Sequence, residues 1–143
     1  MPPRTCSFEV RGIPAPQGSK RHVGHGVMIE SSKKVKPWRE AVKAAAIEAM
    51  QKRGITQPFG GPLQAVIIFA LPRPRAAPKS RIYPDRKPDL DKLLRSTLDA
   101  LTDAGLISDD SRLVALLGRK VYAAPNTLMP WPGASIDVGT HLA

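Results

Sequence analysis

The segment from Leu63 to Leu71 constrains the fold more than any other part of the chain, because it is an almost unbroken apolar run. A run of this length is typical of a strand, and continuous apolar composition is typical of a strand with both faces covered. Gly60, Gly61 and Pro62 precede it and indicate a turn. We therefore expect this segment to be the central strand of a sheet that is covered on both faces.

Two segments show the three- and four-residue apolar spacing of amphipathic helices. The first begins at Ser32 and ends near Gly54, with Trp38 on its apolar face. The second spans Leu90 to Ala104, and its predicted buried stripe is Leu90, Leu94, Leu98 and Leu101. Asp89 is a candidate N-cap, and Gly105 is a candidate C-cap.

Four further strands are predicted, of which the second has the weakest pattern. They are Phe8 to Ile13, His22 to Ile29, Leu113 to Tyr122 and Ala134 to Thr140. The order β-β-α-β-α-β-β predicts an α/β (α+β) fold, with a single mixed or antiparallel sheet flanked by two helices. A length of 143 residues suits one domain spanning residues 1–143.

The sequence also indicates a compartment. Cys6 is the only cysteine, so we expect neither disulfides nor a Cys/His zinc site, and we interpret Cys6 as a small apolar residue. The apolar runs are too short to span a bilayer, and the N-terminus lacks the apolar core of a signal peptide. We expect a cytoplasmic protein without a membrane partner.

Charge is unevenly distributed along the chain, whose formal net charge is +10. Residues 89–110 contain six acids and two bases, whereas the rest of the chain contains 20 bases and six acids. A basic surface suits a polyanion, and a small acidic centre suits a divalent cation. The pattern predicts a nucleic-acid-binding protein with a metal site.

Basic residues gather in a proline-rich segment from Leu71 to Lys87, which we call the basic loop. Arginine and lysine on an irregular segment can follow a phosphate backbone, although the same segment can also be an ordinary solvated loop. Tyr83 is a candidate for stacking on a base. The candidate DNA-binding residues, in this loop and elsewhere, are Lys20, Arg21, Arg73, Arg75, Lys79, Arg81, Arg86, Lys87, Lys92 and Lys120.

Aspartates flank both ends of the second predicted helix. From Asp91 to Gly105 the helix rises about 21 Å, and five extended residues to Asp110 return about 17 Å if the chain doubles back. The ends then differ by about 4 Å along the axis, which two aspartates sharing one ion can span. Asp109 and Asp110 point to opposite faces of an extended segment, so only one of them is expected to face the helix start.

Magnesium prefers octahedral oxygen ligands and retains several waters, so two or three aspartates suit a phosphate-bound ion. Such an ion orients or deprotonates a water and neutralises charge that develops on the phosphate, which predicts phosphodiester hydrolysis. Arg95, one turn after Asp91, is expected beside the cluster. Ordinary explanations remain open, since Asp89 can cap the helix and Asp109-Asp110 can form a turn.

The segment from Arg86 to Asp110 resembles the signature of the RusA family of Holliday junction resolvases, or crossover junction endodeoxyribonucleases. That family has Asp-x-Asp-Asn, a lysine one turn later, Asp-Ala-Leu and a final Asp-Asp, in this order. The corresponding residues here are Asp89-Leu-Asp91-Lys92, Arg95, Asp99-Ala-Leu and Asp109-Asp110. The stretch from Gly12 to Arg21 resembles the family's opening strand and basic loop more loosely.

The resemblance implies a Mg²⁺-dependent endonuclease, with Mn²⁺ as an expected substitute, often encoded by a phage or prophage. Such enzymes work as homodimers and make paired nicks in four-way DNA junctions during recombination and repair. Carried over by position, Asp89, Asp91 and Asp110 are catalytic metal ligands, with Asp109 as a candidate assisting residue. Arg95 takes the place of the catalytic lysine.

Two positions depart from the family pattern. Lys92 stands where asparagine is usual, which places a cation near the metal, and Arg95 replaces a point charge with a planar fork that binds phosphate bidentately. Two alternatives stay open: a protein that binds branched DNA without cutting it, and a nuclease that acts on forks or flaps. The symmetry of the junction independently favours a dimer, since one acidic cluster cuts one strand.

Overall fold

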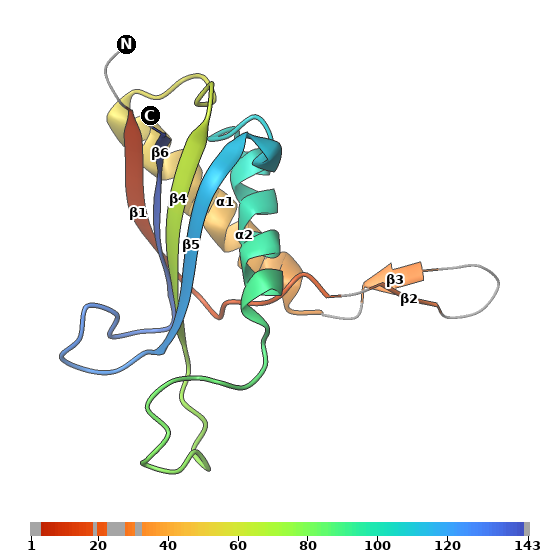
Figure 1. Cartoon of the computed structure of the whole chain (residues 1–143), viewed down its shortest axis with the longest axis vertical. Helices are drawn as coiled ribbons and strands as arrows, with labels where there is room; N and C mark the ends of the chain where they lie inside the picture. The colour runs from red at the N-terminus through yellow and green to blue at the C-terminus, as the bar shows by residue number, and fades with distance from the viewer. Residues whose placement is uncertain (1–3, 19, 23–27, 31–32, 142–143) are drawn as a thin grey trace.

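The computed structural model describes residues 4–18, 20–22, 28–30 and 33–141. In chain order the elements are β1 (Thr5–Arg11), β2 (Lys20–His22), β3 (Met28–Glu30), α1 (Val35–Arg53), β4 (Leu63–Leu71), α2 (Leu90–Ala104), the 3-10 helix η1 (Asp110–Arg112), β5 (Leu113–Tyr122) and β6 (Gly133–Thr140). The main sheet forms one layer, and α1 and α2 form the second (Figure 1). The predicted class, α+β with one mixed sheet and two helices, is confirmed.

The main sheet has four strands in the order β1-β6-β4-β5. β4 is antiparallel to β6 and parallel to β5, and β1 is antiparallel to β6. A parallel pair needs a long crossover connection, and here the basic loop and α2 supply it between β4 and β5. β4 is therefore an inner strand with a neighbour on each side, as predicted, whereas β5 is an edge strand.

The expectation that β4 is covered on both faces was wrong. Its odd-numbered residues from 63 to 69 are buried, whereas Gln64 is exposed and Val66 and Ile68 are half-buried. Both helices lie on the same side of the sheet (Figure 1). In the described part of the chain no helix lies over the other face of β4 (Figure 1), and the side chains of Val66 and Ile68 on that face are only partly removed from water.

The predicted strand from His22 to Ile29 does not join the main sheet. The described residues at its two ends belong to β2 and β3, which pair with each other as a separate antiparallel ribbon. Residues 23–27 lie outside the described part of the chain. Figure 1 shows this ribbon projecting sideways from the two-layer body, beyond the start of α1.

Both helices end at the glycines expected from the sequence. Gly54 has φ 67° and Gly105 has φ 81°, the left-handed conformation in which a side chain would be strained. Backbone N–H groups after each helix donate to the last free carbonyls, for example Leu106 N–H to the Leu101 carbonyl at 3.1 Å. These caps fix the point at which the chain leaves α2 toward η1 and β5.

The buried face of α2 is rotated relative to the predicted stripe. Leu93 and Leu101 are fully buried, whereas Leu90 and Leu94 are half-buried at the margin of the core. The reason is α1, which packs against the side of α2 that carries Thr97. Trp38 of α1, 2% exposed, donates from its indole N–H to Thr97 Oγ1 at 3.1 Å. The prediction that Trp38 lies in the core is confirmed.

Cys6 is buried among core residues, and burial raises the pKa of its thiol, so it has the small apolar role expected. Among the described helices, none has both the length and the apolar composition needed to cross a membrane.

Candidate active site

Asp89 and Asp91 lie at the N-terminal end of α2, and both are exposed. Asp89 is the N-cap residue, and its backbone carbonyl accepts a hydrogen bond from Leu93 N–H at 3.0 Å. Its carboxylate makes no capping hydrogen bond. Capping therefore does not account for the carboxylate, which lies where the helix dipole favours negative charge.

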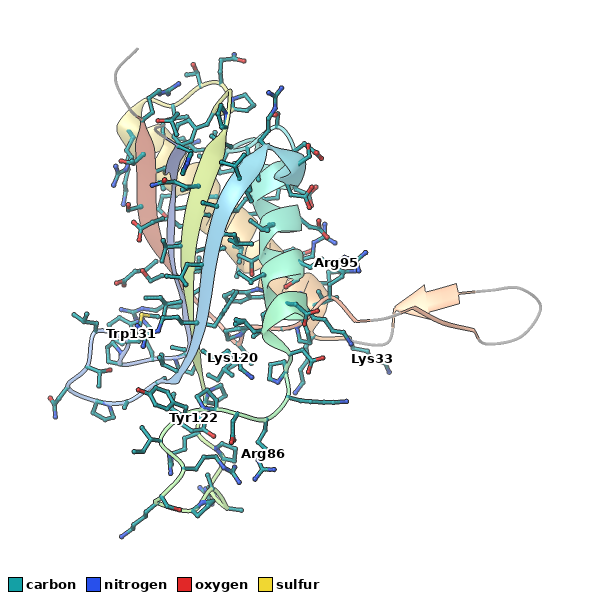
Figure 2. The ribbon with its side chains drawn as sticks, in the orientation of Figure 1. Lys33, Arg86, Arg95, Lys120, Tyr122 and Trp131 are labelled. Carbon is teal, nitrogen blue, oxygen red and sulfur yellow. The ribbon has the colours of Figure 1, made fainter. Side chains whose placement is uncertain are left out.

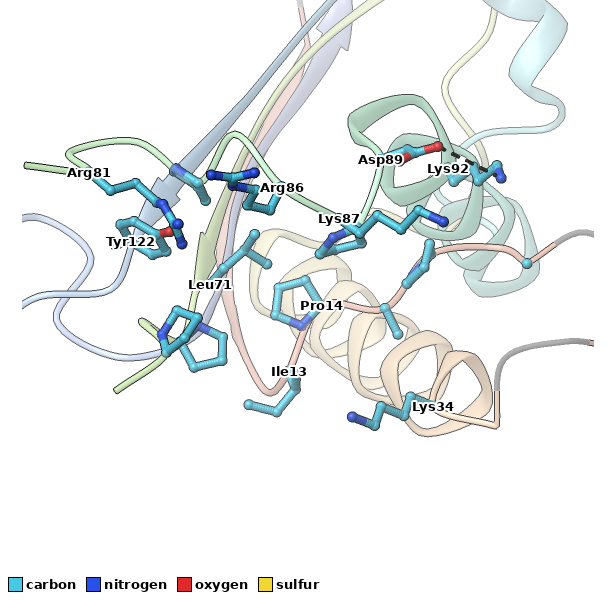
Figure 3. Close-up of a pocket in the computed structure, with 17 residues that line it drawn as sticks. Ile13, Pro14, Lys34, Leu71, Arg81, Arg86, Lys87, Asp89, Lys92 and Tyr122 are labelled. Atoms are coloured by element: carbon cyan, nitrogen blue, oxygen red, sulfur yellow. Dashed lines mark ion pairs between the residues drawn. The ribbon is translucent and has the colours of Figure 1, made fainter. Parts of the chain in front are cut away.

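Lys92 lies beside this acidic pair. Its Nζ is 3.7 Å from Asp89 Oδ2, and the two side chains are 42% and 46% exposed (Figure 3). An exposed pair at this separation contributes about 0–1 kcal/mol, so the ammonium can leave the carboxylate at little cost. Lys92, which stands where the resembling family usually has asparagine, is thus close to the Asp89 carboxylate without being fixed to it.

Further along α2, Asp99 forms a second charged group with Arg95 and Asp110. Burial raises the pKa of Asp99; Arg39 lowers it, Asp110 raises it and Arg95 lowers it to smaller extents. Asp110 and Arg95 therefore both act electrostatically on the Asp99 carboxylate. Figure 2 shows Arg95 projecting from α2 away from the sheet, and the residue is exposed.

The structure does not return Asp110 to the start of α2. Figure 1 shows η1, which begins at Asp110, beside the C-terminal end of α2, whereas Asp91 lies in the first turn of that helix. The segment after α2 is not one continuous extended run as the prediction assumed, since it bends at Leu106 and Ser108, on either side of the Ile107 bridge, before Asp110 opens η1. In the described part of the chain, no group of three or more His, Cys, Asp or Glu side chains is placed to hold a metal ion.

Asp109 caps η1. Its carboxylate accepts hydrogen bonds from the backbone N–H of Ser111, at 3.1 Å, and from the Ser111 hydroxyl. These hydrogen bonds lower the pKa of Asp109, with the side-chain bond as the largest cause. The observed contacts give Asp109 a structural role in placing Asp110.

The donor set at the start of α2 fits a divalent metal in kind. Magnesium is commonly held by one or two carboxylates, completed by waters and substrate phosphates. Asp89 and Asp91 are exposed carboxylates, separated by one residue, next to a basic loop. They match a site that the phosphate of the substrate completes.

A cavity of about 580 Å³ opens beside Asp89, between the basic loop and the segment that follows β1 (Figure 3). Leu71, Tyr122 and several prolines form its apolar walls, and lysines and arginines surround them. The sequence did not indicate that Tyr122 lines this cavity. Only the parallel pairing of β5 with β4, which sets Leu71 opposite Tyr122, shows that the end of β5 faces the basic loop.

Lys120, a predicted DNA-binding residue, fastens the basic loop to the sheet. Its ammonium donates to the backbone carbonyls of Arg86, at 2.8 Å, and Pro88, at 2.9 Å. These residues immediately precede Asp89. Figure 2 shows Lys120 on β5 near the loop that carries Arg86. Its observed contacts are structural, and DNA contact by Lys120 stays a prediction.

Arg73 likewise holds the loop together. Its guanidinium donates to the carbonyls of Arg81, at 2.8 Å, and Pro78, at 2.7 Å. It also lies over the ring of Tyr122, 5.0 Å from the centroid. The loop is irregular, as predicted, and these contacts give it a defined shape.

The remaining candidate DNA-binding residues divide into two groups. Arg75, Lys79, Arg86 and Lys87 are exposed on the basic loop, and Arg81 is half-buried there. Lys20 and Arg21 belong to strand β2. Their contact with DNA, and the stacking of a base on Tyr83, which is 62% exposed, stay predictions.

A family model described as Endodeoxyribonuclease RusA matches residues 10–128 of this chain. No match was found among curated proteins. The family match includes α1, α2, β4, β5 and all the acidic residues discussed above. The chain therefore belongs to the RusA family of Holliday junction resolving endonucleases, and it is an endodeoxyribonuclease that hydrolyses DNA.

Proposed function

From this family membership, we propose that the protein resolves four-way DNA junctions by paired, Mg²⁺-dependent nicks during recombination and repair in the cytoplasm. Mn²⁺ is the expected substitute for Mg²⁺. The observation that carries the proposal is the Asp89 carboxylate, which makes no capping hydrogen bond and has Asp91 two positions along the chain, beside a loop rich in exposed cations. This arrangement supplies hard oxygen donors where a phosphate is also bound.

Asp89 and Asp91 are the proposed metal ligands. When bound, the ion activates water and neutralises charge on the scissile phosphate. Arg95, one turn along the same helix, has a planar fork of N–H groups that can bind two phosphate oxygens and stabilise charge that develops on them. Lys92 can exchange its weak pairing with Asp89 for the phosphate backbone as DNA arrives.

Asp110 is proposed as a further acid of the same active site. Asp110 opens η1 beside the C-terminal end of α2, whereas Asp89 and Asp91 lie at the N-terminal end of that helix (Figure 1). Asp109 assists by capping η1 and so fixing the backbone that carries Asp110. The cations of the basic loop, with Lys20 and Arg21, are proposed to hold the DNA arms through their phosphates.

The uncovered edge of the sheet supports the proposed homodimer. On β5, Val114 is 61% exposed, Leu116 43% and Leu117 56%. Residues 113–118 contain no charged side chain in a chain of net charge +10, so two copies can approach here without strong repulsion. An exposed apolar edge strand readily pairs with another strand, and twofold pairing of β5 would extend the sheet across both subunits.

The dimer proposal is tested by sedimentation of Leu117→Lys and of Ile82→Lys, which adds the same charge at another exposed apolar position. We expect Leu117→Lys to be monomeric and to lose paired nicking, and Ile82→Lys to stay dimeric. A Leu117→Lys protein that remains a dimer at micromolar concentration would place the interface elsewhere.

The activity is tested by comparing a four-way junction, a fork and a linear duplex at fixed salt, each with Mg²⁺ and with EDTA. Wild type should cut the junction in two opposed strands, only with the metal, and Asp91→Asn should lose at least about 100-fold in rate, as expected for a lost metal ligand. Glu48→Gln, on the exposed side of α1, is the matched control. If the protein cuts forks faster than junctions, the fork is its preferred substrate. If it binds junctions with Mg²⁺ present but does not cut them, the proposed nuclease activity is refuted.

A further inference from the structure

We infer that the cavity beside Asp89 binds one unstacked nucleotide of the DNA substrate, with its base inside and its phosphates on the basic rim. The inference rests on the proposed function for its substrate, branched DNA. It adds a base-binding site next to the position of cutting.

The walls of the cavity suit a flat apolar group. Leu71 and Tyr122 lie at the ends of two parallel neighbouring strands, and Ile13 lines the side formed after β1. Proline rings from the basic loop and from the segment after β1 supply most of the remaining walls. A volume of about 580 Å³ is within the range of roughly 300–1,000 Å³ that is typical of small-ligand sites. Aromatic and apolar side chains are the surfaces on which unpaired bases stack.

The rim of the cavity suits a phosphodiester. Lys34, Arg81, Arg86, Lys87 and Lys92 line it, and Asp89 is the one acidic residue among the described residues of the lining. Figure 3 shows these cations surrounding the opening from different elements. A ligand with an apolar plane and flanking negative charge matches both parts of the site. A nucleotide within a DNA strand has this chemistry.

Both walls are held in place before any ligand binds. On one side, Gln17 N–H donates to the Lys92 carbonyl at 3.0 Å, and the buried Ser96 hydroxyl donates to the Ala15 carbonyl at 2.7 Å. On the other side, Lys120 fastens the end of the basic loop. A preformed cavity loses little conformational entropy on binding, which favours a specific occupant.

Asp89 belongs to both the cavity and the proposed metal pair. A base in this cavity is therefore attached to a phosphate close to Asp89 and Asp91. Bases at the exchange point of a junction are more easily unstacked than bases within a continuous duplex, because extrusion costs least where pairing is already weakened. Occupation of the cavity would thus both position the strand and favour branched DNA.

The test uses a four-way junction carrying 2-aminopurine, moved one nucleotide at a time around the exchange point, with the full-length protein in EDTA. We expect one position to show a fluorescence change on binding. Ile13→Trp, which places a bulky ring at a 51% exposed position of the cavity wall, should abolish this change. Ile82→Trp, at a 72% exposed position outside the lining, should retain it.

Removing the base at the responding position should weaken junction binding by wild type roughly 5- to 150-fold, the range for loss of one stacked base, and should leave Ile13→Trp nearly unaffected. The inference is overturned if no position responds, if Ile13→Trp keeps the full response, or if the abasic junction binds wild type equally well. A response that depends on Ile13, in a protein that does not cut junctions with Mg²⁺, would support the cavity and refute junction resolution.

Discussion

Lys120 can hold the basic loop to the sheet or contact DNA, and these two roles predict different effects of Lys120→Met on stability and on DNA binding. In the structure its ammonium donates two hydrogen bonds to the carbonyls of Arg86 and Pro88. Hydrogen bonds that involve a charged group contribute about 1.5–3 kcal/mol each, but water can replace the bond at the exposed Arg86. We therefore expect Lys120→Met to lower the free energy of unfolding by about 2–3 kcal/mol.

The assay is thermal and urea unfolding of Lys120→Met beside Lys79→Met, which removes the same charge from an exposed position of the basic loop. For a chain of this size, the expected loss lowers Tm by about 5–10 °C. Lys79→Met should change stability by less than about 0.5 kcal/mol. Lys120→Met should also slow junction cleavage, because the segment before Asp89 is no longer fastened to β5.

Salt dependence separates the structural role from DNA contact. Loss of a phosphate contact reduces the slope of log affinity against log salt by about one, whereas loss of a structural contact leaves the slope unchanged. We expect an unchanged slope for Lys120→Met and a reduced one for Lys79→Met. A Lys120→Met protein with wild-type Tm and a reduced slope would refute the reasoning and make Lys120 a DNA contact.

Three further predictions concern buried and titrating groups. Thr97→Val should lower the free energy of unfolding by about 1–3 kcal/mol in urea titrations, because the buried Trp38 indole N–H loses its acceptor, and an unchanged midpoint would contradict this. Burial raises the pKa of Asp99 in the folded state, so ionisation of this carboxyl disfavours folding. Asp99→Asn should therefore raise Tm at neutral pH, and this gain should shrink as the pH falls through the folded-state pKa and vanish below the pKa of the unfolded state. The Ser111 hydrogen bonds lower the pKa of Asp109, so the ionised carboxylate stabilises the fold above pH 3.8, and this stabilisation is lost as the pH falls through the folded-state pKa. Asp109→Ala should therefore lower Tm at neutral pH and approach the wild-type Tm in acid. A difference in Tm that stays constant with pH would exclude the Ser111 hydrogen bonds as the cause.

Local signals were sufficient for most elements. Gly54 and Gly105 end the two helices because the left-handed conformation there needs no side chain, a requirement visible in the sequence itself. The period of the first helix similarly identified Trp38 as buried. These features depend on residues within one turn or one strand, so sequence patterns predict them well.

Features that depend on tertiary arrangement were not predictable in the same way. An apolar strand such as β4 has the same composition whether one or two layers cover it, and only the placement of both helices on one side shows that Val66 and Ile68 are half-buried. After Gly105 the course of the chain is set by a bridge between Ile107 and Phe59, and no local sequence pattern indicates this contact. The prediction that Asp110 reaches Asp91 assumed one continuous extended segment, whereas the chain bends at Leu106 and Ser108 and opens η1 at Asp110.

The central claim is that Asp89 and Asp91 hold the catalytic metal ion. Anomalous diffraction from crystals soaked in Mn²⁺ tests it most directly, because it locates the ion among the acidic residues of α2. We predict a peak within coordination distance of the Asp89 and Asp91 carboxylates, and no such peak in Asp91→Asn crystals. A peak between Asp99 and Asp110 instead, unchanged in Asp91→Asn, would contradict this assignment.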